Sequence, residues 1–256
     1  MLLLLPPSET KRDGGGDPPL DTARLSFPSL DPVRARVVAA TQSLAADAEA
    51  TMRALKLGPR QAGEVERNRC VASSPTMAAL DRYTGVLYDA LDAPSLDDAA
   101  RSYAAQHVAV HSALFGLVGA LDPIPAYRLS HDSRLPDFTL RAVWRDAVAG
   151  VLATHPGVIV DLRSEGYAEL GPLPDRADAA FVRVVSEDAA GRRRALNHFN
   201  KRAKGEFTRA VLQGRPEGIE TIDDLVEWAA EAGFRLEPAA RSGAAALGSL
   251  HLELVA

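Results

Sequence analysis

Cysteine is nearly absent from this chain, which contains one cysteine among 256 residues. A single cysteine excludes an internal disulfide framework and a zinc site made of several cysteines, and it fits a reducing compartment. The chain also lacks an excess of positive charge, because 29 basic residues stand against 34 acidic ones and the formal net charge is −5. This acidity argues against a protein that coats nucleic acid through its overall charge, although a local basic cleft is compatible with it.

Long apolar runs are missing as well. Leu2–Leu5 follow Met1, but no basic residue precedes them and Pro6 ends the run. A secretory signal needs about 7–15 apolar residues, and a membrane-spanning helix needs about 20. We therefore expect a cytoplasmic protein that is not bound to a membrane, with Leu2–Leu5 as its first buried strand.

The spacing of apolar residues predicts alternating helices and strands. After a loop over 6–30, Asp31 is expected to cap one long amphipathic helix that ends near Leu57. Further helices are expected over 61–69, 75–91, 96–104, 139–153, 201–213 and 221–232. Strands are expected over 107–111, 157–162, 180–186, 193–199 and 249–255, and the third and fourth of these can form a hairpin. This order indicates a single α+β domain over residues 1–256, with a mixed central sheet flanked by helices.

Polar clusters lie at the ends of two expected strands. Residues 8–11 read Ser-Glu-Thr-Lys and follow the first strand, and Lys11 supplies a positive charge there. Residues 161–165 read Asp-Leu-Arg-Ser-Glu and end the strand over 157–162. Open α/β sheets usually bind ligands at such strand ends. The alternatives are a solvated turn for the first cluster and a helix-capping box for the second.

A basic segment stands out in this acidic chain. Residues 189–205 carry six Lys and Arg residues and no carboxylate. Lys201 and Lys204 are three residues apart and therefore share one face of the expected helix. The segment can bind phosphate, or it can form an ordinary solvated face.

A turn between two expected helices, residues 55–65, weakly matches a helix-hairpin-helix. Such a hairpin directs backbone N–H groups at a phosphate. Lys56 occupies the place of the usual first hairpin glycine, and Arg60 follows a Gly-Pro pair. The alternative is a plain turn between helices.

Arg128 is a further candidate, because arginine in a proline-bounded loop often clamps an anion. Its alternative is an ion pair with Asp122 or Asp132. The six histidines show no metal-ligand spacing, since His107 and His111 would only share a strand face without a third ligand. With no glycine-rich nucleotide loop and no Gly-x-Ser-x-Gly sequence, we expect neither a metal nor a cofactor.

Several motifs occur in a recognisable order. They are Pro-Ser-Glu-Thr-Lys at 7–11, Ser112 to Gly116, Tyr127-Arg128-Leu129, 161–167, Lys-Arg-Ala-Lys-Gly at 201–205 with Arg209, and Ala-Gly-Phe at 232–234. This ordered set resembles the YaaA family of peroxide stress proteins, and the first motif resembles its actinobacterial branch. The family often has Asn-Leu-Ala-Ser where residues 161–164 of this chain read Asp-Leu-Arg-Ser. It often has Lys-Lys-Ala-Arg-Gly where residues 201–205 read Lys-Arg-Ala-Lys-Gly.

The resemblance implies protection from hydrogen peroxide, with lowered free iron limiting damage to DNA. It also implies DNA binding through a positively charged cleft and a helix-hairpin-helix, and it brings no established enzyme activity. The first hypothesis is therefore a monomeric stress protein that binds double-stranded DNA, including damaged DNA. Its candidate DNA-binding residues are Lys11, Lys56, Arg60, Arg128, Lys201, Lys204 and Arg209.

The second hypothesis is an enzyme that acts on a nucleotide or nucleic-acid base in the same cleft. Its candidate catalytic residues are Glu165, Ser164 and Lys11. A third reading stays open, in which the basic segment only pairs with the chain's own carboxylates.

Overall fold

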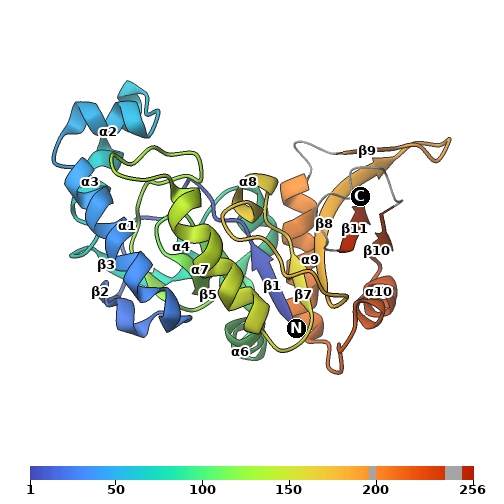
Figure 1. Ribbon diagram of the computed structural model, residues 1–256. Coiled ribbons are helices and arrows are strands. Elements are labelled where there is room, and N and C mark those ends of the chain that lie inside the picture. The colour runs from blue at the N-terminus through green and yellow to red at the C-terminus, as the bar shows by residue number, and fades with distance from the viewer. Residues whose placement is uncertain (196–199, 240–249) are drawn as a thin grey trace.

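The computed structural model describes residues 1–195, 200–239 and 250–256 (Figure 1). Its centre is an eight-stranded sheet in the order β10-β11-β8-β7-β1-β4-β5, with β9 paired to β8. The strands are β1 (Leu2–Leu5), β4 (Val108–Ser112), β5 (Gly116–Gly119), β7 (Ile159–Asp161), β8 (Ala179–Glu187), β9 (Arg193–Ala195), β10 (Arg235–Pro238) and β11 (Leu250–Val255). Strands β4, β1, β7, β8 and β11 are parallel, while β5, β9 and β10 are antiparallel to their neighbours. The predicted mixed sheet is confirmed.

Helices and a small second sheet surround this centre. The helices are α1 (Asp31–Leu44), α2 (Ala48–Ala54), α3 (Gly63–Arg69), α4 (Ala79–Arg82), α5 (Val86–Leu91), α6 (Asp98–His107), α7 (Leu140–Thr154), α8 (Glu165–Ala168), α9 (Asn200–Gly214) and α10 (Ile222–Glu231). The second sheet has the order β2 (Asp17–Pro19), β3 (Pro75–Ala78), β6 (Pro123–Ile124). Short 3₁₀ turns are η1 (Thr22–Arg24), η2 (Pro28–Leu30), η3 (Pro59–Gln61) and η4 (Ala93–Ser95). Figure 1 shows α1, α2 and α3 at one end of the molecule and α10 at the other, with β1 between them.

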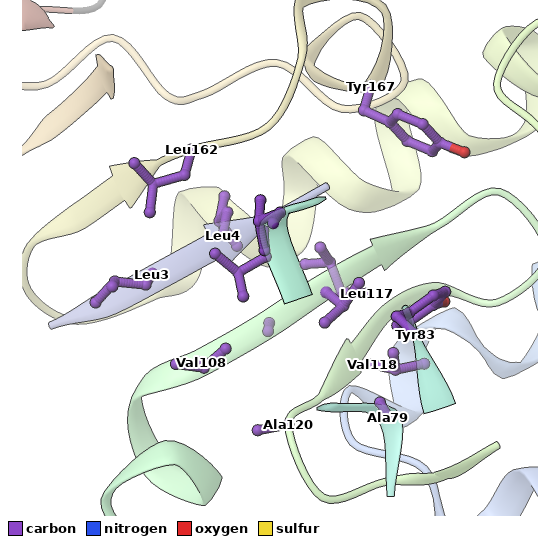
Figure 2. Packing of buried hydrophobic residues seen from close by; sticks show 14 of the residues in the cluster. Leu3, Leu4, Ala79, Tyr83, Val108, Leu117, Val118, Ala120, Leu162 and Tyr167 are labelled. Carbon is purple, nitrogen blue, oxygen red and sulfur yellow. The ribbon is translucent and has the colours of Figure 1, made fainter. Parts of the chain in front are cut away.

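The four leucines of β1 are buried because the strand lies between two parallel neighbours. Leu3 is in register with Val108 on β4 and with Val160 on β7. Figure 2 shows Leu3 and Leu4 packed close to other apolar side chains of this layer. A strand that is covered on both faces needs apolar residues at every position, and each buried leucine contributes about 1.5–3 kcal/mol. The predicted first strand is confirmed for this reason.

The predicted helix over 31–57 is wrong in its length. It is two helices, because the Asp47 side chain accepts a hydrogen bond from the Ala50 N–H and so starts α2 anew. Asp31 is not the N-cap that the sequence suggests; it is the first residue of α1 and pairs with Arg34 at 2.8 Å.

The predicted helix over 75–91 is also wrong. Its first four residues form β3, which pairs with β2 and β6, and Gly85 at φ 96° separates α4 from α5. The predicted strand at 107–111 is shifted by one residue, because His107 ends α6. The hairpin of β8 and β9 is confirmed over its described part. Residues 196–199 and 249 of the expected strands lie outside the described residues.

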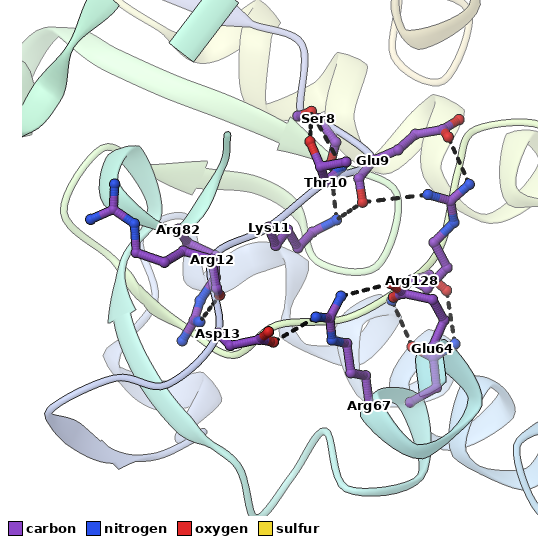
Figure 3. Close-up of polar contacts among 11 residues, drawn as sticks. Ser8, Glu9, Thr10, Lys11, Arg12, Asp13, Glu64, Arg67, Arg82 and Arg128 are labelled. Atoms are coloured by element: carbon purple, nitrogen blue, oxygen red, sulfur yellow. Dashed lines mark hydrogen bonds and ion pairs between the residues drawn. The ribbon is translucent and has the colours of Figure 1, made fainter. Parts of the chain in front are cut away.

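Two buried arginines hold the long loop over 6–30 in place. Arg82 donates to the Arg12 carbonyl oxygen in this loop (Figure 3). It also donates to the carbonyl oxygens of Gly14 in the loop, Pro75 on β3 and Ile124 on β6. Arg34 donates to the carbonyl oxygen of Ser26 in the loop and to two carbonyl oxygens next to and within β5. A buried guanidinium without these acceptors would be strongly unfavourable, so each arginine fixes its loop segment.

Helix α9 packs very closely against α5 at Gly205. A Cβ atom built at this position would lie 2.2 Å from the Leu87 carbonyl oxygen and 2.9 Å from the Ala90 Cβ. No side chain fits there, so the glycine sets the distance between the two helices.

We predict that Gly205→Ala lowers the free energy of unfolding by about 1–3 kcal/mol, because the added methyl group forces α9 away from α5. Gly150→Ala is the matched control: it is also within a helix, α7, and a Cβ there meets nothing within 4 Å. This control should raise stability by about 0.5–1 kcal/mol through helix propensity. Urea denaturation of both variants measures the difference, and equal effects would contradict the close packing.

Candidate functional site

A pocket of about 580 Å³ opens at the carboxyl ends of β1 and β7, and we call it the central pocket. The two strands are parallel, with Leu4 in register with Asp161, so the segments that follow them meet at one edge of the sheet. The lining comprises residues 6–10, residues 84–88, Ser130, His131, Ser164, Tyr167, Asn200, Lys201 and Lys204. Its volume is within the range of about 300–1,000 Å³ that is typical of small-molecule sites.

Lys204 is a buried amine in the wall of the central pocket. Only 4% of the residue is exposed, and its Nζ donates to the Arg163 carbonyl oxygen at 3.1 Å. The same Nζ lies 5.7 Å from the centre of the Phe181 ring. Burial lowers the pKa of Lys204 to about 8, and the carboxylates of Asp161 and Glu165 partly oppose this shift. A substantial fraction of this amine is therefore neutral near physiological pH.

The carbonyl that holds Lys204 belongs to a rigid buried network. The Arg163 guanidinium forms two hydrogen bonds to the Asp161 carboxylate, at 2.8 and 2.6 Å. It also contacts Nδ1 of His111 at 2.7 Å and donates to the Gly171 carbonyl at 2.9 Å. Asp161, Arg163 and His111 are fully buried. Burial, with the Arg163 charge, lowers the pKa of His111 well below its usual value, so the neutral imidazole accepts this hydrogen bond.

Lys11 is buried behind the pocket lining and does not line the pocket itself. Its Nζ donates to the carbonyl oxygens of Ser8 at 2.9 Å and Glu9 at 3.4 Å (Figure 3). It also lies over the rings of Tyr127 at 4.0 Å and Tyr83 at 5.3 Å. Burial lowers the pKa of Lys11 to about 7, with a further contribution from the charge of Arg128. Lys11 therefore holds the 8–10 turn in the shape that lines the pocket.

Ser164 and Glu165 face different surfaces. Ser164 lines the central pocket, and its side chain makes no capping hydrogen bond to α8. Glu165 lines a second pocket of about 420 Å³, where its carboxylate pairs with Arg183 at 2.9 Å and is 72% exposed. The three candidate catalytic residues therefore do not line one pocket, because α8 turns the Glu165 side chain toward Arg183 on β8.

Most of the predicted cationic residues already have partners. Arg128 pairs with Glu9 at 2.6 Å, and Lys56 pairs with Asp132 at 2.6 Å. Arg209 donates to the Leu91 carbonyl at 2.8 Å and joins α9 to the end of α5. Neither of the two expected acidic partners of Arg128 is the observed one.

The basic segment 189–205 is partly neutralised. Arg193 pairs with three glutamates, those at 187, 237 and 253. Arg192 pairs with Asp188, and Arg202 pairs with Glu206. Among the described residues, Lys201 has no hydrogen-bond or ion-pair partner, and it is exposed at the rim of the central pocket.

The helix-hairpin-helix predicted over residues 55–65 falls on the turn between α2 and α3. Lys56 adopts a left-handed backbone with φ 54°, a conformation that glycine adopts more readily. The N–H groups of Leu57 and Gly58 already donate within the turn, to the Met52 carbonyl and to the Gln61 side chain. Arg60 is exposed on this turn. The Lys56–Asp132 pair ties the turn to the loop that carries His131 into the central pocket.

The sequence motifs give no signal for several lining residues, among them Tyr88 and His131. Tyr88 donates to the Pro6 carbonyl at 2.8 Å and so closes one side of the pocket. His131 packs on Tyr167 with 5.1 Å between ring centres. Each of these residues lies far along the chain from the strand-end motifs, so only the fold brings them together.

The described residues contain no group of three or more His, Cys, Asp or Glu side chains that could hold a metal ion. In the same part of the chain, no helix is long and apolar enough to cross a membrane.

Comparison with known proteins identifies the family. The sequence model of the family described as "Peroxide stress protein YaaA" matches residues 1–240. A UPF0246 protein of Corynebacterium glutamicum (strain R) is 41% identical over 242 residues, which is 93% of this chain and 95% of that protein. A UPF0246 protein of Streptomyces coelicolor is 40% identical over 235 residues, 88% of this chain and 90% of that protein. The match spans both strand-end motifs and the basic motif of α9, and the chain therefore belongs to the YaaA family of peroxide stress proteins.

Proposed function

We propose that this peroxide stress protein binds DNA at the central pocket and thereby helps to limit iron-dependent oxidative damage. The observation that carries the proposal is the position of Lys201, an exposed cation without a partner in the described chain, at the rim of a nucleotide-sized pocket. A phosphate at Lys201 leaves the attached sugar or base within reach of the pocket. Unpaired cations supply the counterion-release free energy on which DNA binding depends.

The turn between α2 and α3 extends this proposed surface. Its Lys56 contacts Asp132, the neighbour in sequence of His131 in the pocket wall. Lys56 on the turn and Lys201 on α9 therefore approach the loop over 130–133 from different parts of the fold. A duplex that lies along this loop would contact both elements.

Protection from iron-dependent damage would then act at the DNA. Hydroxyl radicals react close to where they form, so a bound protein shields the DNA segment that it covers. The proposal requires no iron ligand from this chain.

A second candidate function is an enzyme that acts on a nucleotide or nucleic-acid base in the same pocket. The observation that favours it is the buried Lys204 amine, whose pKa is lowered to about 8. Perturbed titratable groups within pockets are concentrated at functional sites. Passive phosphate binding gains less from an amine that is partly neutral near physiological pH than from one that stays fully charged.

We predict that Lys201→Ala weakens duplex DNA binding and lowers the slope of log affinity against log salt by about 0.9, the value for one lost phosphate contact. Arg202→Ala is the matched control, since it removes the same charge from the next residue of α9, where Arg202 already pairs with Glu206 at 2.8 Å. Its salt slope should change much less. Mobility-shift titrations at several salt concentrations measure both slopes. Equal changes in the two variants would contradict a local phosphate contact at Lys201 and would show that only the overall charge of the protein affects binding.

The function itself is tested by survival in hydrogen peroxide. Cells that lack the protein should be sensitive, and the native chain should restore survival. Lys201→Ala should restore it only partly, while Arg202→Ala should restore it fully. Full restoration by Lys201→Ala, at equal protein levels, would contradict a protective role for DNA binding at this rim.

A further inference from the structure

Lys204 differs from the other lysines of the chain in a way that phosphate binding does not explain. The chain has four lysines, at 11, 56, 201 and 204. Lys56 and Lys201 are exposed, and the Nζ of Lys11 is engaged by two carbonyl oxygens and two aromatic rings. Only Lys204 combines burial with a place in the wall of the central pocket.

The contacts of Lys204 suit a neutral amine. In the described part of the chain its Nζ makes one hydrogen bond, as donor to the Arg163 carbonyl oxygen. A neutral amine that donates one N–H keeps its lone pair free and leaves one N–H without a protein acceptor, whereas an ammonium would leave two. The lowered pKa agrees with this geometry. Buried lysines of this kind act as nucleophiles toward carbonyl carbon.

We propose that Lys204 is the nucleophile of the central pocket and forms an imine with an aldehyde, namely the ring-opened deoxyribose of an abasic site in DNA. This inference rests on the proposed DNA-binding function and names its substrate class. Radical attack on DNA releases bases and leaves such aldehydes, and a sugar without its base fits a nucleotide-sized pocket. Intact duplex contains no aldehyde, so imine formation would distinguish DNA with an abasic site from undamaged DNA.

The reaction balances without an oxidant or reductant. The Nζ lone pair attacks the aldehyde carbon, and the carbonyl electron pair moves to oxygen, which takes a proton. The resulting carbinolamine loses a proton from nitrogen and its hydroxyl group as water. One amine and one aldehyde thus give one imine and one water, and hydrolysis reverses the step.

Two other lining residues can assist this step. The Ser164 hydroxyl, which makes no cap bond, can donate to the aldehyde oxygen. The His131 imidazole lines the same pocket and can carry the proton that leaves with water.

Reductive trapping tests the proposal. The native protein is incubated with a duplex that holds one abasic site, an intact duplex, or glycolaldehyde, each with cyanoborohydride, which converts an imine into a stable amine. Adducts are mapped to peptides, and binding of both duplexes is measured separately. We expect an adduct with the abasic duplex at Lys204, and none with the intact duplex.

Two variants make the test specific. Lys204→Arg keeps a long basic side chain but removes the nucleophilic amine, and trapping should fall to the level of the intact duplex. Arg202→Lys places an additional amine on the same helix outside the pocket, and no adduct should form at position 202. Thermal denaturation checks that both variants are folded.

The outcomes separate the two proposals. Binding of the duplexes without trapping, or adducts spread over the exposed lysines, would overturn the imine inference and leave DNA binding intact. Failure to bind either duplex would reject the proposed function. Glycolaldehyde trapped at Lys204 without DNA binding would overturn the DNA aldehyde as substrate.

Discussion

The buried ion pair between Asp161 and Arg163 is the interaction on which the site depends. It lies at the carboxyl end of β7, where Arg163 also contacts His111 and the Gly171 carbonyl. Breaking such a pair leaves an uncompensated buried charge and costs about 3–5 kcal/mol. The pair therefore fixes the backbone of residue 163, whose carbonyl holds Lys204 in the pocket wall. Asp161 and Arg163, the two residues that differ from the Asn-Leu-Ala-Ser motif named above, pair with each other in the structure.

Burial divides the cations of this chain into different roles. The guanidinium groups of Arg34 and Arg82 donate hydrogen bonds to backbone carbonyl oxygens and so hold the long loop in place. Arg193 is occupied by glutamates on neighbouring strands. Only cations that keep their charge without such partners can gain from a phosphate, and Lys201 is the clearest of these at the central pocket. A count of basic residues in segment 189–205 therefore overstates the charge that it offers to DNA.

The sequence predicts the elements that an apolar pattern determines, and it misses those determined by distant partners. The strand Leu2–Leu5 and the helix over 139–153 follow from continuous or periodic apolar residues, and both are present. The local sequence predicts a helix where β3 lies, because the pairing of β3 with the proline-containing strands β2 and β6 leaves no local signal. Within the site, the strand-end motifs predict a ligand site near Ser164, and this residue lines the central pocket. They could not reveal that Glu165 faces the other way or that Lys204 is buried, because both facts depend on the packing of α8 and α9.

The central claim is that nucleic acid enters the central pocket beside α9. Photocrosslinking with a duplex that carries one photoreactive base, followed by peptide mapping, tests it most directly. The account predicts crosslinks to the pocket residues Tyr88 and His131 and to the start of α9 around Lys201. Crosslinks confined to surfaces away from the pocket, such as α10 or the exposed side of α7, would contradict it.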